Sequence, residues 1–91
     1  MAVNTMLIAA KVKRAANRKR TLLALDKPMM PSELLKKIYN KNSSTYFNIV
    51  SRALAELVNL KLVKVINPKE KTGRIYELTN LGKKVKGEIE S

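Results

Sequence analysis

The sequence contains no cysteine and no histidine. Without these residues the chain cannot form disulfides, thiolate nucleophiles, zinc sites of the Cys/His type or imidazole general bases. We therefore expect a protein that is not an enzyme and that uses no metal and no cofactor. The absence of cysteine fits a reducing cytoplasm. The N-terminal run MAVNTMLIAA has no basic start and only a short apolar stretch, which indicates neither a signal peptide nor a membrane span.

Acidic residues are scarce. Only 7 Asp and Glu stand against 19 Lys and Arg in 91 residues, which gives a net charge of +12 and a sequence pI of about 10.3. A chain of this length forms one small domain. So large a positive charge is typical of proteins that bind a polyanion, most often nucleic acid.

Proline and glycine are also few, with 3 of each. Before Pro28 nothing interrupts a helix, so we expect one from about Asn4 to Leu25, with Ile8, Val12, Ala15 and Leu22 near one side. That helix is basic along its middle, where Lys11, Lys13, Arg14, Arg18, Lys19 and Arg20 stand.

The stretch DKPMMPSELLKKIYN predicts a turn, a short extended piece at Met29 and Met30, and a second helix. Pro31 suits the first helical position, and Glu33 suits the first turn, where the helix dipole favours a negative charge. We expect the buried face of this helix to consist of Leu34, Leu35 and Ile38. A polar turn, NKNSST, follows it.

The stretch SSTYFNIVSRALAELVNLKLV, residues 43 to 63, predicts a third helix at 45–60, capped by Ser43, Ser44 or Thr45. At about 100° per residue, its core side consists of Phe47, Val50, Leu54 and Leu57. The opposite side consists of Thr45, Asn48, Ile49, Arg52, Glu56 and Asn59. A helix face that meets only water usually alternates Lys and Glu, whereas this one carries amides, a hydroxyl and a guanidinium, which suit the reading of hydrogen-bonding edges.

Two β-rich runs, LVKVI and RIYELT, flank the sequence NPKEKTG and predict a hairpin. Gly73 allows the loop its turn, and the loop carries the cations Lys69, Lys71 and Arg74. Thr79 or Asn80 then caps a last helix, on which Leu81, Val85 and Ile89 recur at intervals of four.

The predicted order is helix, short strand, helix, helix, hairpin, helix. This order predicts an α+β fold, mostly α: a winged helix-turn-helix with an extended N-terminal helix. We divide the chain into an N-terminal extension, residues 1–13, and a winged-helix domain, residues 14–91.

Several motifs resemble those of the small winged-helix transcription regulators of archaea, which are related to the MarR-like and ArsR-like repressors. The motifs, which extend over about residues 14–85, are Asn17-Arg18, Pro31 to Leu34, Val50 to Leu57, Leu62-Val63, Gly73 to Thr79 and Gly82. At three positions the chain differs from that pattern, with Lys61 in place of a frequent Gly, Met30 in place of a capping Thr, and Ala15 in place of a helix-starting Ser. Because that Ser is missing, we expect the first helix to continue back to Thr5 or Asn4.

The pattern and the resemblance together imply a regulator that binds double-stranded DNA in the cytoplasm, associated with the nucleoid. We expect the third helix, residues 45–60, to be the recognition helix that enters the major groove. Its DNA-contacting residues would be Ser43, Ser44, Thr45, Tyr46, Asn48, Ile49 and Arg52. The wing, residues 67–74, would contact the backbone or minor groove through Lys69, Lys71 and Arg74, helped by Arg14, Arg18 and Lys19 of the first helix. Arg52 has a simpler alternative role, an ion pair with Glu56 one helical turn away.

Two other functions stay open at this point. One is an architectural, weakly sequence-specific DNA-binding protein of the chromatin kind, and the other is a winged helix that contacts RNA or protein.

We also expect a homodimer, because one recognition helix reads few base pairs. Its interface would consist of Met6, Leu7, Ile8, Val12, Val85 and Ile89. No effector pocket is evident, although Met6, Met29, Met30, Tyr39 and Tyr76 are candidates to line one.

Overall fold

A computed structural model describes residues 4–40 and 43–90, so part of the predicted NKNSST turn lies outside the described residues. The chain is mostly helical with one small antiparallel sheet, as the α+β prediction required. The helices are α1 (Thr5–Lys13), α2 (Ala16–Ala24), α3 (Pro31–Tyr39), α4 (Ser44–Asn59) and α5 (Asn80–Glu90). The strands are β1 (Val63–Val65) and β2 (Tyr76–Leu78).

The prediction of one continuous helix from Asn4 to Leu25 is wrong, because the chain turns between α1 and α2. Ala15 has an extended backbone, with φ −119° and ψ 113°, so α1 folds back and packs against α5. This packing completely buries Val12. The assignment of Val12 to a dimer interface is therefore wrong as well, since burial against α5 outweighs the weak preference of the sequence for a straight helix. Asn4 caps α1, where its side-chain oxygen accepts the N–H groups of Met6 and Leu7.

The short extended piece before α3 pairs with the sheet. The N–H of Met29 donates to the carbonyl of Tyr76 at 2.9 Å, and the N–H of Tyr76 donates to the carbonyl of Met29 at 2.8 Å. On its other edge β2 pairs with β1, with Val63 opposite Leu78. The return strand of the hairpin is thereby held between β1 and the loop that precedes α3.

Helix α4 ends in a left-handed residue that is not glycine. Lys61 has φ +67°, and its N–H donates to the carbonyl of Val58 while the N–H of Leu62 donates to the carbonyl of Leu57, both at 3.0 Å. This is the Schellman arrangement, which is accompanied here by burial of Leu57 and Leu62. Lys61 thus adopts the left-handed geometry for which glycine is the usual residue at the end of a helix.

Thr79 connects the end of α4 to the start of α5. Its hydroxyl donates to the carbonyl of Lys61 at 2.7 Å and accepts the N–H of Gly82 at 2.9 Å, which confirms Thr79 as the cap of the last helix. A Cβ at Gly82 would collide with the carbonyl of Leu62. Only glycine therefore lets α5 approach this close to the segment before β1.

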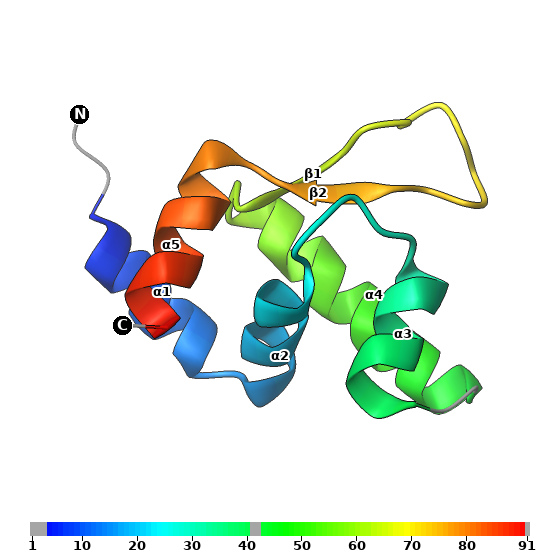
Figure 1. Cartoon of the computed structure of the whole chain (residues 1–91), viewed down its shortest axis with the longest axis horizontal. Helices are drawn as coiled ribbons and strands as arrows, with labels where there is room; N and C mark the ends of the chain where they lie inside the picture. The colour runs from blue at the N-terminus through cyan, green and yellow to red at the C-terminus, as the bar shows by residue number, and fades with distance from the viewer. Residues whose placement is uncertain (1–3, 41–42, 91) are drawn as a thin grey trace.

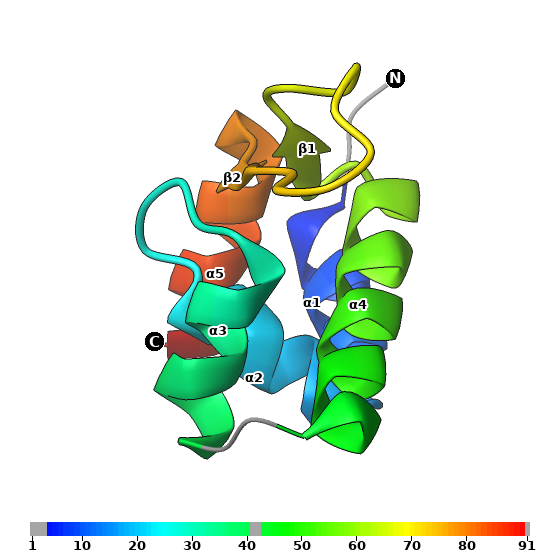
Figure 2. The same ribbon diagram turned by 90° about the vertical axis from the view of Figure 1, so that its right-hand side faces the viewer.

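The helices lie around a single core, with α1 and α5 together at one end of the molecule (Figure 1). Helix α3, the first turns of α4 and the hairpin loop, residues 66–75, lie at the other end. Seen from that end, the hairpin lies above α3 and α4 (Figure 2). The fully buried side chains include Val12, Leu22, Leu25, Leu34, Val50, Leu54, Leu57, Leu62 and Val85. Phe47 is not among them, because it is 40% exposed, so its assignment to the core is wrong.

Candidate nucleic-acid interface

The side of α4 that faces away from the core is polar and accessible. Val50, Ala53, Leu54 and Leu57 make its buried side. The exposed residues away from that side, which we call the outer face of α4, are Ser44, Thr45, Asn48, Arg52, Ala55 and Asn59. The side chains of the outer face are thus short and uncharged, except for that of Arg52.

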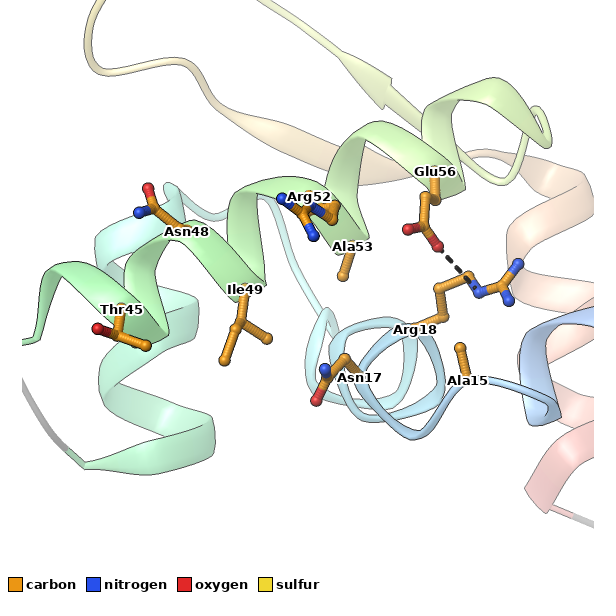
Figure 3. Close-up of a pocket in the computed structure, with 9 residues that line it drawn as sticks. All are labelled: Ala15, Asn17, Arg18, Thr45, Asn48, Ile49, Arg52, Ala53 and Glu56. Atoms are coloured by element: carbon orange, nitrogen blue, oxygen red, sulfur yellow. Dashed lines mark ion pairs between the residues drawn. The ribbon is translucent and has the colours of Figure 1, made fainter.

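A groove of about 340 Å³ separates α4 from the start of α2 (Figure 3). It is lined by Ala15, Asn17 and Arg18 of the α1–α2 region and by Thr45, Asn48, Ile49, Arg52, Ala53 and Glu56 of α4. We call it the α2 groove. It gathers most of the polar face that the sequence predicted for the third helix, together with the Asn-Arg pair of α2.

Within the α2 groove, Glu56 pairs with Arg18. The Arg18 Nε and the Glu56 Oε2 are 3.0 Å apart, and the two side chains are 26% and 43% exposed. The N–H of this nitrogen is not directed at the oxygen, so the contact is an ion pair without a hydrogen bond. Glu56 therefore does not form the predicted alternative pair with Arg52, and no ion pair of Arg52 occurs within residues 4–40 and 43–90.

A second groove, of about 430 Å³, lies on the other side of α4, toward the hairpin. We call it the hairpin groove. Its walls are Phe47 and Ser51 of α4, the start of α3 at Met30, Pro31 and Ser32, and the hairpin residues Lys71, Thr72, Gly73, Arg74 and Tyr76. Helix α4 is therefore a ridge between two grooves, each with cationic side chains in its wall.

The hairpin loop is held in shape by its own hydrogen bonds. Asn67 accepts the N–H of Ile75 at 2.7 Å and donates from its amide nitrogen to the carbonyl of Gly73 at 3.1 Å. Arg74 donates from Nε to the carbonyl of Glu70 at 2.8 Å, while Gly73 has φ +68°. The loop therefore presents its cations from a defined backbone, and part of the Arg74 guanidinium is used within the loop.

The other predicted DNA-contacting residues have varied surroundings. Ser43 precedes α4 but makes no side-chain capping bond. Tyr46 is half-buried and packs on the core, with its ring centroid 4.7 Å from that of Tyr39, so it faces α3 and not the outer face. Arg14 and Lys19 are exposed, as are the loop residues Lys69 and Lys71.

The predicted dimer residues do not form one exposed surface. Val12 and Val85 are fully buried, while Ile8 and Ile89 pack against the same core. Val12 and Val85 therefore cannot contact a second copy, because they stabilise the packing of α1 on α5 within one chain. Met6 and Leu7 remain accessible, at 71% and 63%.

The candidate ligand residues are likewise dispersed. Met6 is exposed on α1 and Met29 is buried in the core, whereas Met30 and Tyr76 line the hairpin groove. Tyr39 stacks on Tyr46 and donates from its hydroxyl to the Asn17 side chain at 3.0 Å. The structure brings no more than two of these five side chains to any one described groove.

Sequence reasoning missed Phe47, Ser51 and Ala55. About 100° per residue places Phe47 at the edge of the apolar sector and Ser51 beside it, and this edge meets the hairpin groove instead of the core. Ala55 was missed because a small apolar residue gives no signal in a search for polar contacts, although it lies on the outer face.

Across residues 4–40 and 43–90 the structure contains no group of three or more carboxylate, imidazole or thiolate side chains able to hold a metal. None of the helices in this part of the chain has the length and apolar character that crossing a bilayer requires. Comparisons with protein-family models, with curated proteins and with solved structures find no match to this chain.

Proposed function

We propose that the protein is a winged-helix regulator that binds double-stranded DNA. Helix α4 would enter the major groove with its N-terminal end first, and the hairpin loop would act as a wing on the backbone or minor groove. The major groove is about 12 Å wide and admits one helix. Arg52 and Asn48 on the outer face suit guanine and adenine respectively, because their side chains can form paired hydrogen bonds with these bases.

One observation carries the proposal. The hairpin groove has α4 as one wall and the loop cations Lys71 and Arg74 in another, so the helix that would read bases and the loop that would bind phosphates border the same surface. The net charge of +12 adds a long-range attraction for a polyanion.

A footprinting experiment on genomic fragments tests the proposal. Discrete protected sites support a sequence-specific regulator, uniform protection supports an architectural protein, and no protection contradicts DNA binding and favours an RNA or protein partner. The fragments should be examined at several salt concentrations, because affinity for DNA depends steeply on salt.

The variant Arg52→Ala sharpens this test. If Arg52 contacts a base, we expect a loss of about 1–3 kcal/mol on the preferred site and a smaller loss on random DNA. Lys84→Ala on α5 removes one exposed cation away from α4 and is the matched control. Equal affinity of wild type and Arg52→Ala for both kinds of DNA would contradict the role of Arg52.

An architectural function is the second candidate, and the distribution of charge favours it. Exposed lysines also occur on α1 and α5, which lie at the end of the molecule opposite the first turns of α4, at Lys11, Lys13, Lys83 and Lys84. In that case Arg52→Ala and Lys84→Ala should weaken binding to all sequences by similar amounts.

We also propose that the protein acts as a homodimer through the start of α1. Met6 and Leu7 are the large apolar side chains that this helix leaves exposed, and since they are neighbours they offer a contiguous apolar patch that a partner can cover. Light scattering on wild type and on a Met6→Ser, Leu7→Ser double variant tests this, because the substitutions leave the buried side of α1 unchanged. A wild-type monomer at micromolar concentration contradicts the dimer.

A further inference from the structure

The α2 groove combines two arginines with one acid. Arg18 and Arg52 both line it, as does Glu56, the only acidic residue between Ser43 and Val63. The remaining polar groups of the lining are the amides of Asn17 and Asn48 and the hydroxyl of Thr45. The formal charge of the lining is positive, and all of these groups except the carboxylate can donate to an anion.

The charge of Arg18 is compensated by Glu56, whereas no described acid compensates Arg52. The Nε of Arg18 is buried, at 3.0 Å from the Glu56 Oε2, and no described group accepts a hydrogen bond from it. Arg18 thus has a charge partner but an unsatisfied donor. A guanidinium in this state can still gain from an oxygen that approaches with better geometry.

The start of α2 adds to the positive potential of the same groove. Ala15 occupies the cap position, so no side chain accepts the first N–H groups of the helix, and no acid stands in its first turn. These N–H groups carry the positive end of the helix dipole. Ala15 lines the α2 groove, so the uncapped helix start borders the cavity that both arginines line (Figure 3).

We propose that the α2 groove receives a backbone phosphate of the bound duplex, and that Glu56 weakens this contact by competing with the phosphate for Arg18. The inference rests on the proposed function. A helix in the major groove has a phosphate backbone on each side, and α4 has a cationic groove on each side. In the hairpin groove no acid lines the wall, whereas in the α2 groove Glu56 keeps Arg18 paired in the wild type, so the phosphate there is held by the other groups of the lining. The two backbones are therefore held with unequal strength, and Glu56 sets the difference.

The isosteric variant Glu56→Gln tests the proposal. With the carboxylate removed, Arg18 can pair with phosphate, so a plot of log K against log salt should steepen by about 0.9, the value for one additional phosphate contact. At 0.1 M salt this corresponds to roughly five- to tenfold tighter binding. Glu90→Gln makes the same change in net charge on α5 and should leave the slope unchanged.

Two further variants separate a phosphate contact from a general effect of charge. The double variant Arg18→Gln, Glu56→Gln should return to the wild-type slope, because the gain needs Arg18. Arg18→Gln alone should change the slope by less than about 0.3, since its charge is already compensated. This single variant gives a result even if Glu56→Gln folds poorly, and thermal melting of each variant establishes folding.

The outcomes distinguish the proposals. DNA binding by wild type with the same slope for Glu56→Gln overturns the competition by Glu56 and leaves the proposed function in place. A full loss of about 0.9 in slope for Arg18→Gln alone also overturns it, because Arg18 would then already hold a phosphate in the wild type. A wild-type protein that binds no DNA overturns the proposed function and this inference together.

Discussion

Replacing Lys61 by glycine should stabilise the protein. Lys61 has φ +67°, a region in which the Cβ of an ordinary residue is crowded at a cost of roughly 1–2 kcal/mol. Glycine avoids this cost but gains conformational freedom in the unfolded chain, which removes about 0.4–1 kcal/mol. The expected net gain in the free energy of unfolding is about 0.5–1 kcal/mol, equivalent to a rise in Tm of roughly 2–8 °C for a domain of this size.

The measurement is thermal and urea denaturation followed by circular dichroism, with Lys61→Ala as the control. Alanine removes the same positive charge from this cationic chain but keeps the Cβ, so its stability should stay close to wild type. Asparagine, which tolerates the left-handed region better than most residues, should fall between alanine and glycine. Equal stability of the alanine and glycine variants would refute the reasoning, because any gain would then come from the loss of charge.

The remaining predictions concern packing, charge and the hairpin. Gly82→Ala should lower the free energy of unfolding by about 1–3 kcal/mol in a denaturation experiment, because the new Cβ meets the carbonyl of Leu62; wild-type stability would contradict the close approach of α5. The hydrogen bond from Lys37 of α3 lowers the pKa of Asp26 below its usual value. The stability that this ion pair contributes is therefore present above the unfolded pKa of about 3.9, and it is lost as the pH falls through the folded pKa. An NMR titration of the carboxyl group that shows an ordinary pKa would refute the pair. Neutralising Lys69 and Lys71 together should reduce the slope of log K against log salt concentration for DNA binding by roughly 1–2. An unchanged slope would mean that the loop lies away from the duplex.

The sequence predicted the order of elements because local signals coincide with them. Pro31 begins α3, Thr79 caps α5, and the extended piece at Met29 pairs with Tyr76. Pro31 and Thr79 act through backbone groups within a few residues, so they can be recognised without the fold, whereas the sequence predicted the extended piece at Met29 but not its pairing with the distant Tyr76.

The errors arose where a distant segment decides the structure. The chain turns at Ala15 because α1 packs on α5, an element more than sixty residues away along the chain. Glu56 had a plausible partner one turn away in Arg52, yet it pairs with Arg18 of another helix. Phe47 was assigned to the core from its angle on the helix, but the space beside it belongs to the hairpin groove. Periodicity gives the direction of a side chain and not what lies in that direction.

The reciprocal hydrogen bonds between Met29 and Tyr76 tie the base of the hairpin to the segment before α3. Because the return strand is clamped between β1 and the loop before α3, the base of the hairpin cannot swing relative to the helices without breaking both bonds. Beyond the strands, the N–H of Ile66 donates to the carbonyl of Ile75, and the Asn67 side chain joins the two sides of the loop at Ile75 and Gly73. Hydrogen bonds thus continue from the segment before α3 into the hairpin loop, so the loop cations have a defined position before any partner binds.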